Sequence, residues 1–225
     1  MSDKPILFSG PMVRALLAGT KTQTRRVLKP QPFVDELRNF CAPDRKGKVW
    51  IYGQDGQGVP HAQKFADTEL RIKVGDRLWV REAWTLHDRA GDVGTVAYAA
   101  TFKSHGWTET IEQIPRDLTL STRLQPVQRG WRPSIHMPRW ASRLTLTVTE
   151  VRVERLQDIS VADAVAEGAL ASAKVDQFAQ VHAIPMYRAI WTGINGDGLW
   201  EANPWVAAYT FTVQHGNIDH LARAA

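Results

Sequence analysis

The sequence predicts an α+β protein: one domain built as a mixed β-barrel with short flanking helices. A regular alternation of apolar and polar residues over Leu144–Val153 predicts a central strand. A second apolar run, Trp205–Val213, predicts a final strand, and the apolar positions of Pro11–Ala18 recur with the spacing of a short helix. The composition, 44% hydrophobic and 23% charged over 225 residues, is sufficient for one good-sized core.

The remaining elements are predicted from turn and capping signals. Gly19 is expected to end the first helix, because glycine adopts the left-handed conformation without a Cβ penalty. Ser160 caps a later helix that Gly168 ends, which places Glu167 in its last turn. The other expected elements are strands at Pro5–Ser9, Thr24–Leu28, Leu78–Trp84 and Gly94–Ala99, the last two paired, and a helix at Asp176–Trp191 bent by Pro185.

Two irregular insertions are expected within a domain spanning residues 1–215, at about 30–72 and 102–141, followed by a loosely ordered tail at 216–225. The first carries several prolines and glycines without a sustained period, and we expect one short hairpin around Val49–Tyr52. The second ends in Trp131–Trp140, where two prolines forbid regular structure. This basic, aromatic loop is either a substrate lid or packing over the barrel end.

The stretch Gly19–Arg26 concentrates hydroxyls and cations directly behind the first helix. In a turn, Lys21 and Thr24 approach each other, and a period of two along the strand puts Thr24 and Arg26 on one face and Arg25 on the other. Burial and neighbouring cations lower the pKa of a lysine, so Lys21 is a candidate base for the Thr24 hydroxyl. The alternative interpretation is a solvated basic turn that touches phosphates or nothing.

Three blocks of this chain resemble the ASCH family of small proteins related to the PUA-like RNA-binding fold. The blocks are Gly19-x-Lys21-x-x-Thr24-x-Arg26, Gly75–Val80, and the segment from Leu156 to Gly168, and they occur in family order. The resemblance implies a PUA-like barrel. Some bacterial members are N(4)-acetylcytidine amidohydrolases that use a lysine, a threonine and a later glutamate, which implies Lys21, Thr24 and Glu167 as catalytic residues here. The chain is about twice as long as a minimal ASCH domain and looks more like the larger phage and prophage members.

Five further residues are candidates for binding substrate. Arg26 is expected to hold a developing oxyanion or to orient Glu167. Glu82, on a strand, rivals Glu167 as the acidic residue, and its structural alternative is to pair with an arginine such as Arg26. Trp131, His136 and Arg139 interleave rings and cations as base-stacking sites do, although tryptophans in a protein of this size also serve packing.

The net charge of +5 is unevenly distributed, and this predicts the class of partner. Residues 1–50 hold ten Lys/Arg against four Asp/Glu, and residues 116–143 hold six arginines against one aspartate. If both segments flank one pocket, they attract a modified nucleoside or RNA. An enzyme acting on N(4)-acylated cytidines is the first expectation, and the alternatives are a PUA-like module that binds RNA without chemistry, or a nuclease.

Cofactors and membranes are not expected. The lone cysteine, Cys41, excludes an internal disulfide, and the seven histidines include no pair at a metal-ligand spacing, so we predict no metal or other cofactor and an activity that survives chelation. No apolar run approaches the ~18 residues of a membrane span, and the N-terminus lacks a signal-peptide pattern. The sequence therefore predicts a cytoplasmic protein without a membrane partner.

Overall fold

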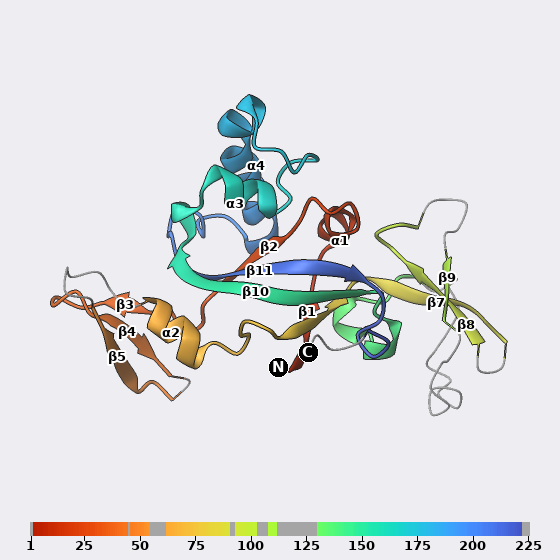
Figure 1. Cartoon of the computed structure of the whole chain (residues 1–225), viewed down its shortest axis with the longest axis horizontal. Coiled ribbons are helices and arrows are strands. Elements are labelled where there is room, and N and C mark those ends of the chain that lie inside the picture. Colours follow the sequence, from red (N-terminus) through yellow and green to blue (C-terminus); the bar gives the residue numbers. More distant parts are fainter. Residues whose placement is uncertain are drawn as a thin grey trace. The chain divides into compact units, whose positions relative to one another are not determined.

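A computed structural model describes residues 2–44, 46–54, 62–90, 93–102, 108–111 and 130–221 of the chain. It is a mixed α+β protein with a five-stranded sheet and short helices (Figure 1). The strand order is β1 (Asp3–Leu7), β6 (Arg77–Arg81), β10 (Leu144–Arg155), β11 (Trp205–His215) and β2 (Gln23–Val27). Strand β1 runs parallel to β6, whereas β6 with β10 and β11 with β2 are antiparallel, so the sheet is mixed.

Strand β10 is the third of five in this order, which confirms the prediction that the Leu144–Val153 alternation forms a central strand. The expected closure of this sheet into a barrel is not confirmed. Among the described residues the order runs from β1 at one end to β2 at the other, and no closed barrel is detected. Alternation specifies which side chains share a face of a strand, but it does not specify whether the outer strands meet.

Helix α1 (Gly10–Leu17) confirms the predicted first helix and its end. Gly19 has φ +71°, the left-handed conformation that glycine adopts most readily. The chain therefore turns directly after α1 and enters β2 four residues later. This turn carries Lys21 to the start of β2.

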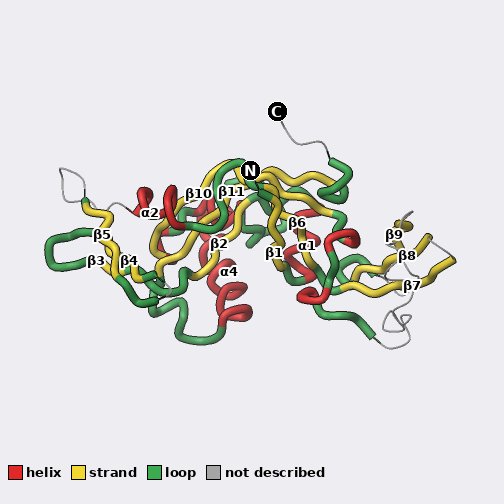
Figure 2. The backbone as a smooth tube through the Cα atoms, turned by 90° about the horizontal axis from the view of Figure 1, so that it is seen from below, coloured by secondary structure: helices red, strands yellow, loops and turns green. Residues whose placement is uncertain are grey.

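The segment from 30 to 72 is more regular than its composition indicates. It forms a second sheet with strand order β3 (Phe33–Val34), β4 (Phe40–Pro43) and β5 (Val49–Gly53), followed by helix α2 (Ala62–Glu69) (Figure 2). The expected hairpin around Val49–Tyr52 is the β4–β5 pair. The expectation of an otherwise irregular insertion was wrong here, because prolines and glycines at the turns hide the period of strands this short.

A third sheet contains β7 (Trp84–Ala90), β8 (Val93–Tyr98) and β9 (Thr108–Ile111). The sequence predicted one strand over Leu78–Trp84, but that stretch divides between β6 and β7, and β8 pairs with β7 instead of β6. Two short 3-10 helices, η3 (Ser134–His136) and η4 (Arg139–Ala141), begin directly after Pro133 and Pro138, respectively. Residues 103–107 and 112–129 of the second expected insertion lie outside the described residues. Its described part contains β9 and the two 3-10 helices, so it is less irregular than expected.

Helices α3 (Val161–Ala166) and α4 (Gln177–Asn195) pack on each other and lie beside β2 (Figure 1). Helix α3 begins after its predicted cap, Ser160, whose Oγ accepts a hydrogen bond from Asp163 N at 3.1 Å. Helix α4 begins one residue later than predicted, because Asp176 is its cap, with Oδ1 accepting from Ala179 N at 2.9 Å. Pro185 lies inside α4. A buried apolar cluster joins α3, α4 and β11, and it includes Ala164, Val165, Tyr187, Trp191 and Val206.

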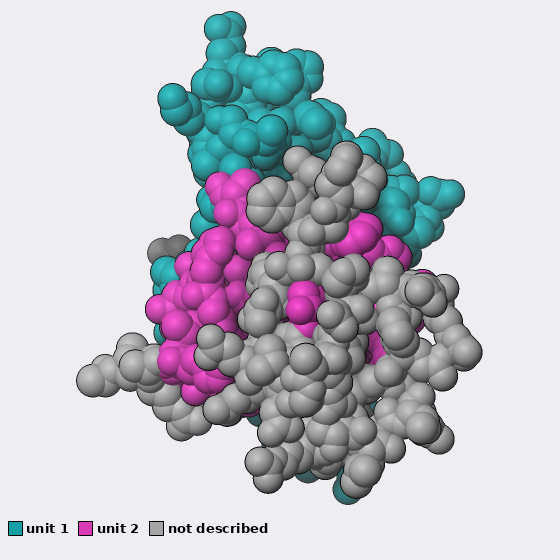
Figure 3. Space-filling model, turned by 90° about the vertical axis from the view of Figure 1, so that its right-hand side faces the viewer, with its two compact units in different colours: residues 1, 19–76, 148–212 teal, residues 2–18, 77–147, 213–225 magenta. Residues whose placement is uncertain are grey.

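The chain divides into two compact units, each built from several segments (Figure 3). The larger segments of unit 1 are Gly19–Asp76 and Val148–Thr212, and those of unit 2 are Ser2–Ala18, Arg77–Thr147 and Val213–Ala225. The described part of the expected loose tail has Ile218 buried and Asn217 Nδ2 donating to the backbone oxygens of Arg139, Trp140 and Ser142 at 2.8–3.1 Å. No described helix is long and apolar enough to cross a membrane.

Candidate functional site

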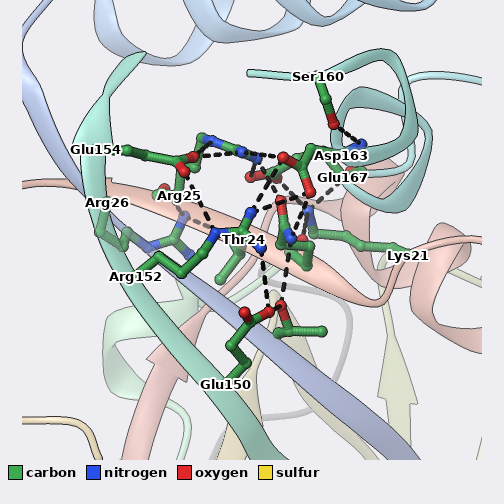
Figure 4. Close-up of polar contacts among 12 residues, drawn as sticks. Lys21, Thr24, Arg25, Arg26, Glu150, Arg152, Glu154, Ser160, Asp163 and Glu167 are labelled. Carbon is green, nitrogen blue, oxygen red and sulfur yellow. Dashed lines mark hydrogen bonds and ion pairs between the residues drawn. The ribbon is translucent and has the colours of Figure 1, made fainter. Parts of the chain in front are cut away.

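Lys21 and Glu167, 146 positions apart in the chain, meet in unit 1 as a buried ion pair (Figure 4). The two residues form an isolated antiparallel β-bridge, and Thr22 N donates to Ala166 O at 2.8 Å, so the turn after α1 is fixed against the end of α3. Lys21 Nζ donates to Glu167 Oε2 at 2.8 Å, to the Glu167 backbone oxygen at 2.8 Å and to the Gln23 backbone oxygen at 2.7 Å. An ammonium has three N–H bonds, so these three acceptors match its donors.

Burial distinguishes this pair from a surface turn. Lys21 is 1% exposed and Glu167 is 3% exposed. Burial lowers the pKa of the Lys21 ammonium below its ordinary value of 10.5, and the opposing effect of the Glu167 carboxylate does not cancel that decrease. The interpretation of Lys21 as part of a solvated basic turn is therefore wrong.

Arg25 connects the pair to a wider ionic group on the same face of β2. Its guanidinium binds Glu154 Oε1 at 2.6 Å, Asp163 Oδ2 at 3.1 Å and Glu167 Oε1 at 3.3 Å, and it also donates to the Gln23 side chain. Each Glu167 oxygen thus has its own cation, Lys21 at one and Arg25 at the other. This arrangement holds the carboxylate in one orientation at the end of α3.

Thr24 and Arg26 lie together on the opposite face of β2, as the period of two predicts. Thr24 is 1% exposed, whereas Arg26 is exposed, and Arg26 donates from one terminal nitrogen to Thr24 Oγ1 at 3.0 Å. Tyr209 of β11 is directly opposite Thr24 in the strand pairing. Burial raises the pKa of Tyr209 to about 12, so its hydroxyl stays protonated near neutral pH.

Arg152 adds a third cation to the ionic group around the pair. Arg152 binds Asp163 Oδ2 at 3.1 Å, Glu150 at 3.1 Å and Glu154 at 3.3 Å. Burial opposes ionisation of Asp163, but the hydrogen bond from Gln23 and the charge of Arg25 outweigh it and lower the Asp163 pKa. Lys21, Arg25 and Arg152 bind the four carboxylates Glu150, Glu154, Asp163 and Glu167, whereas Arg26 lies on the opposite face of β2 (Figure 4).

Glu82 belongs to unit 2 and binds a different cation. It is 1% exposed, and Arg143 Nε donates to its Oε1 at 2.8 Å while Arg143 also stacks over the Tyr98 ring at 4.0 Å from the centroid. The structural alternative considered from the sequence, an arginine partner, is therefore realised, with Arg143 in the place suggested for Arg26.

Trp131, His136 and Arg139 also belong to unit 2. Trp131 packs edge-on against Phe102 at 5.1 Å between ring centroids and is 40% exposed, and His136 is exposed at the end of η3. Arg139 binds Asp3 and Asp219, each at 2.6 Å. Among the eight candidate residues the structure thus forms two pairs in unit 1, Lys21 with Glu167 and Thr24 with Arg26.

The sequence did not identify Arg25, Glu154 and Asp163 as parts of the site. Asp163 was visible only as a capping residue, and Glu154 fell directly after the strand predicted over Leu144–Val153. A signal was present, because Glu150, Arg152 and Glu154 repeat with a period of two and must share a face of β10. Tyr187, buried in α4 beside this group, carried no sequence signal at all.

Among the described residues, no group of three or more His, Cys, Asp or Glu side chains is arranged to hold a metal ion. Searches against protein-family models, curated proteins and solved structures find no match to this chain.

Proposed function

We propose that this protein is an amidohydrolase that removes an acyl group from the exocyclic amine of a cytosine nucleoside of the N(4)-acylcytidine type. The single observation that carries the proposal is the buried Lys21–Glu167 ion pair, with Nζ and Oε2 2.8 Å apart, at the start of the strand that bears Thr24. A PUA-like fold of the ASCH type belongs to the same proposal. It is supported by the mixed sheet and by the meeting of the first and third blocks of the motif.

The ion pair supports acid–base chemistry because burial makes its charged form costly. Taking an ammonium and a carboxylate out of water requires several kcal/mol per ion, which their attraction and hydrogen bonds must offset. Burial lowers the Lys21 pKa, so the free-energy difference between the neutral amine and the ammonium is smaller than for a lysine in water. A proton that moves from Lys21 to Glu167 across their 2.8 Å contact produces an amine base and a carboxylic acid in one step.

The reaction then proceeds through an ester of Thr24. The Lys21 amine leaves the Gln23 carbonyl and takes the Thr24 proton, while the Thr24 oxygen attacks the acyl carbon. The bond between carbon and the exocyclic nitrogen breaks as Glu167 gives its proton to the leaving amine. Water hydrolyses the ester and releases the carboxylic acid, which restores the Thr24 hydroxyl, the Lys21 ammonium and the Glu167 carboxylate.

Arg26 lies on the same face of β2 as Thr24 and is suited to meet the substrate. Its guanidinium already donates to Thr24 Oγ1 at 3.0 Å, so it lies next to the proposed point of attack. A substrate carbonyl that replaces this hydrogen bond frees the Thr24 oxygen for attack and places the developing negative charge beside a cation.

The balance of charge favours a nucleoside over a nucleic acid. Sites that bind phosphates carry an excess of Lys and Arg, whereas here three cations bind four carboxylates. The alternatives, an RNA-binding module without chemistry or a nuclease, predict an excess of positive charge at the same place. They remain as outcomes of the test.

Incubation of the purified protein with N(4)-acetylcytidine tests the proposal, with cytidine release followed by absorbance and chromatography. We expect turnover by the wild type, no turnover by Thr24→Ala, and a measurable rate for Thr24→Ser, because serine keeps the hydroxyl. Thr22→Ala is the matched control, since it removes a hydroxyl from the same turn. Binding of the nucleoside without hydrolysis supports the binding module, and cleavage of RNA supports the nuclease.

A further inference from the structure

Tyr187 of α4 carries a buried hydroxyl group without a hydrogen-bond partner. The residue is 3% exposed, and no described residue lies within hydrogen-bonding distance and geometry of its oxygen. Its ring packs against Trp191 and Trp200, with centroids 6.0 and 6.2 Å away. A phenylalanine has the same ring and lacks only this oxygen, so packing does not explain the hydroxyl.

The Tyr187 hydroxyl lies within electrostatic range of the ionic group around Glu167. Tyr187 shares a buried cluster with Ala164 and Val165 of α3, the helix that ends at Glu167. Burial raises the pKa of Tyr187, and the Glu167 charge raises it further, whereas Arg25 and Arg26 act in the opposite direction. All of these residues belong to unit 1.

A tyrosine in this position is a neutral donor at every pH at which the protein works. Its raised pKa keeps the O–H bond intact, so the hydroxyl can supply a hydrogen bond without adding a charge to the ionic group. Such a donor suits an uncharged acceptor, and a buried one is worth more than a donor in water because its surroundings are of low dielectric constant.

We infer that Tyr187 is a ligand-binding residue of the proposed site, and that its hydroxyl donates a hydrogen bond to a carbonyl oxygen of an uncharged nucleoside. The inference rests on the proposed function for the choice of ligand. It assigns to α4 a direct part in recognition, together with β2 and α3, and it predicts that an added phosphate contributes nothing to affinity.

Tyr187→Phe separates this role from a structural one. We expect a Tm equal to or higher than that of the wild type, because the substitution removes an unsatisfied buried oxygen. We expect kcat/KM for N(4)-acetylcytidine to fall ~10-fold or more, the usual consequence of losing one well-placed donor. Tyr98→Phe is the matched control, since Tyr98 is equally buried but its hydroxyl donates to Ala141 O at 2.8 Å. That variant should lose Tm and keep the kcat/KM of the folded protein.

Calorimetric binding of N(4)-acetylcytidine and its 5′-monophosphate distinguishes failure of this inference from failure of the proposed function. A wild type that binds but does not hydrolyse contradicts only the proposed function, and the ratio of Kd values for Tyr187→Phe and wild type then decides the role of Tyr187. An unchanged Kd and kcat/KM, a lower Tm for Tyr187→Phe, or markedly tighter binding of the monophosphate overturns the inference. A wild type that binds neither compound overturns both.

Discussion

The proposed chemistry depends on the pair Lys21–Glu167, whose side chains are only 1% and 3% exposed. Each charge depends on the other, because a buried ammonium or carboxylate left alone is far more costly than the pair. The same dependence that favours proton exchange within the pair makes both residues important for folding. Measurements of turnover therefore need a measurement of stability beside them.

Glu167→Gln is predicted to lower both properties. Glutamine cannot deliver a proton, so we expect kcat to fall by ~100-fold or more. It also leaves Lys21 without its counter-charge, which costs about 3–5 kcal/mol of unfolding free energy by urea titration. Glu82→Gln, which removes the carboxylate bound by Arg143, is the comparison: loss of turnover there, with Glu167→Gln active, contradicts the assignment.

Lys21→Arg is predicted to be as inactive as Lys21→Ala, measured as kcat/KM with N(4)-acetylcytidine. A guanidinium keeps the positive charge but does not lose a proton in the accessible pH range, so it cannot act as a base. A residue that merely attracts phosphate tolerates this exchange. Full activity of Lys21→Arg would remove Lys21 from the role of base.

At this scale the sequence predicted types of residue better than contacts. The pattern on β2 correctly separated Thr24 and Arg26 from Arg25, because a strand has a fixed period. It placed Lys21 against Thr24, whereas the hydrogen bonds of the Lys21 ammonium described above go to Glu167 and Gln23. The turn that pairs residues 21–22 with 166–167 is a long-range contact, and local spacing contains no information on it.

Helix α3 is short, and its start matters for the site because the helix carries both Asp163 and Glu167. Its six residues include one turn stabilised by Ser160 Oγ. An isolated helix of this length is not stable in water, so its position depends on the cap, on packing against α4 and on the ionic contacts of Asp163.

Ser160→Ala is predicted to lower the unfolding free energy by about 1 kcal/mol and to lower kcat as well. Asp176→Ala, which removes the equivalent cap of α4, is the control and should cost a similar free energy with kcat unchanged. Chemical denaturation and steady-state kinetics measure the two quantities. Equal kcat values for both variants would show that α3 does not need its cap to position Glu167.

The pairing of β1 with β6 in unit 2 has its own acid-sensitive contact. Hydrogen bonds from Arg77 lower the pKa of Asp3 from 3.8 to about 2, and Arg139 adds to the effect. A carboxylate whose pKa is lower in the folded than in the unfolded protein stabilises the fold at pH values above the unfolded pKa. That contribution is lost as pH falls from about 4 to about 2.

Asp3→Asn is therefore predicted to cost about 2 kcal/mol of unfolding free energy at pH 7, with the difference from wild type shrinking toward pH 2. Asp219→Asn is the control, because the Asp219 side chain is 50% exposed and its pairing with Arg139 contributes little. Urea titrations from pH 2 to pH 7 provide the comparison. A pH-independent effect of Asp3→Asn would contradict the ionic origin.

Elements with long periods or clear caps could be predicted from the sequence, and short or composite ones could not. Strands β10 and β11 and helix α1 were found because each repeats its pattern over eight or more residues. Strand β3 has two residues, too few for any period, and the Leu78–Trp84 run hid the break between β6 and β7. The pairing of β8 with β7 followed from that break.

At the scale of the whole molecule, the two compact units are interleaved along the chain. Unit 1 and unit 2 alternate five times from residue 1 to residue 225, and two of the boundaries lie inside strands β10 and β11. Domain boundaries that sequence can reveal are exposed linkers between continuous segments. No such linker marks these boundaries, which explains why one domain was predicted.

Thermal unfolding is predicted to be a single transition by calorimetry, with calorimetric and van't Hoff enthalpies equal. Strands shared by both units cannot lose their conformation in one unit alone without disturbing the other. Proline substitution of Leu146 in β10, a buried position of unit 2, should lower the one transition as a whole. Two resolved transitions would mean that the units unfold independently.

The place of β11 in the sheet bears on how the protein is made. During synthesis, Lys21 to Arg26 leave the ribosome early and Glu167 much later, but β2 gains its neighbouring strand only when residues 205–215 emerge. Until then the growing chain displays an unpaired strand edge with three cations and no completed core beneath it, a state prone to mistaken association. We therefore expect the nascent chain to be most prone to mistaken association before residues 205–215 emerge, and slower elongation over the preceding residues to lengthen that period.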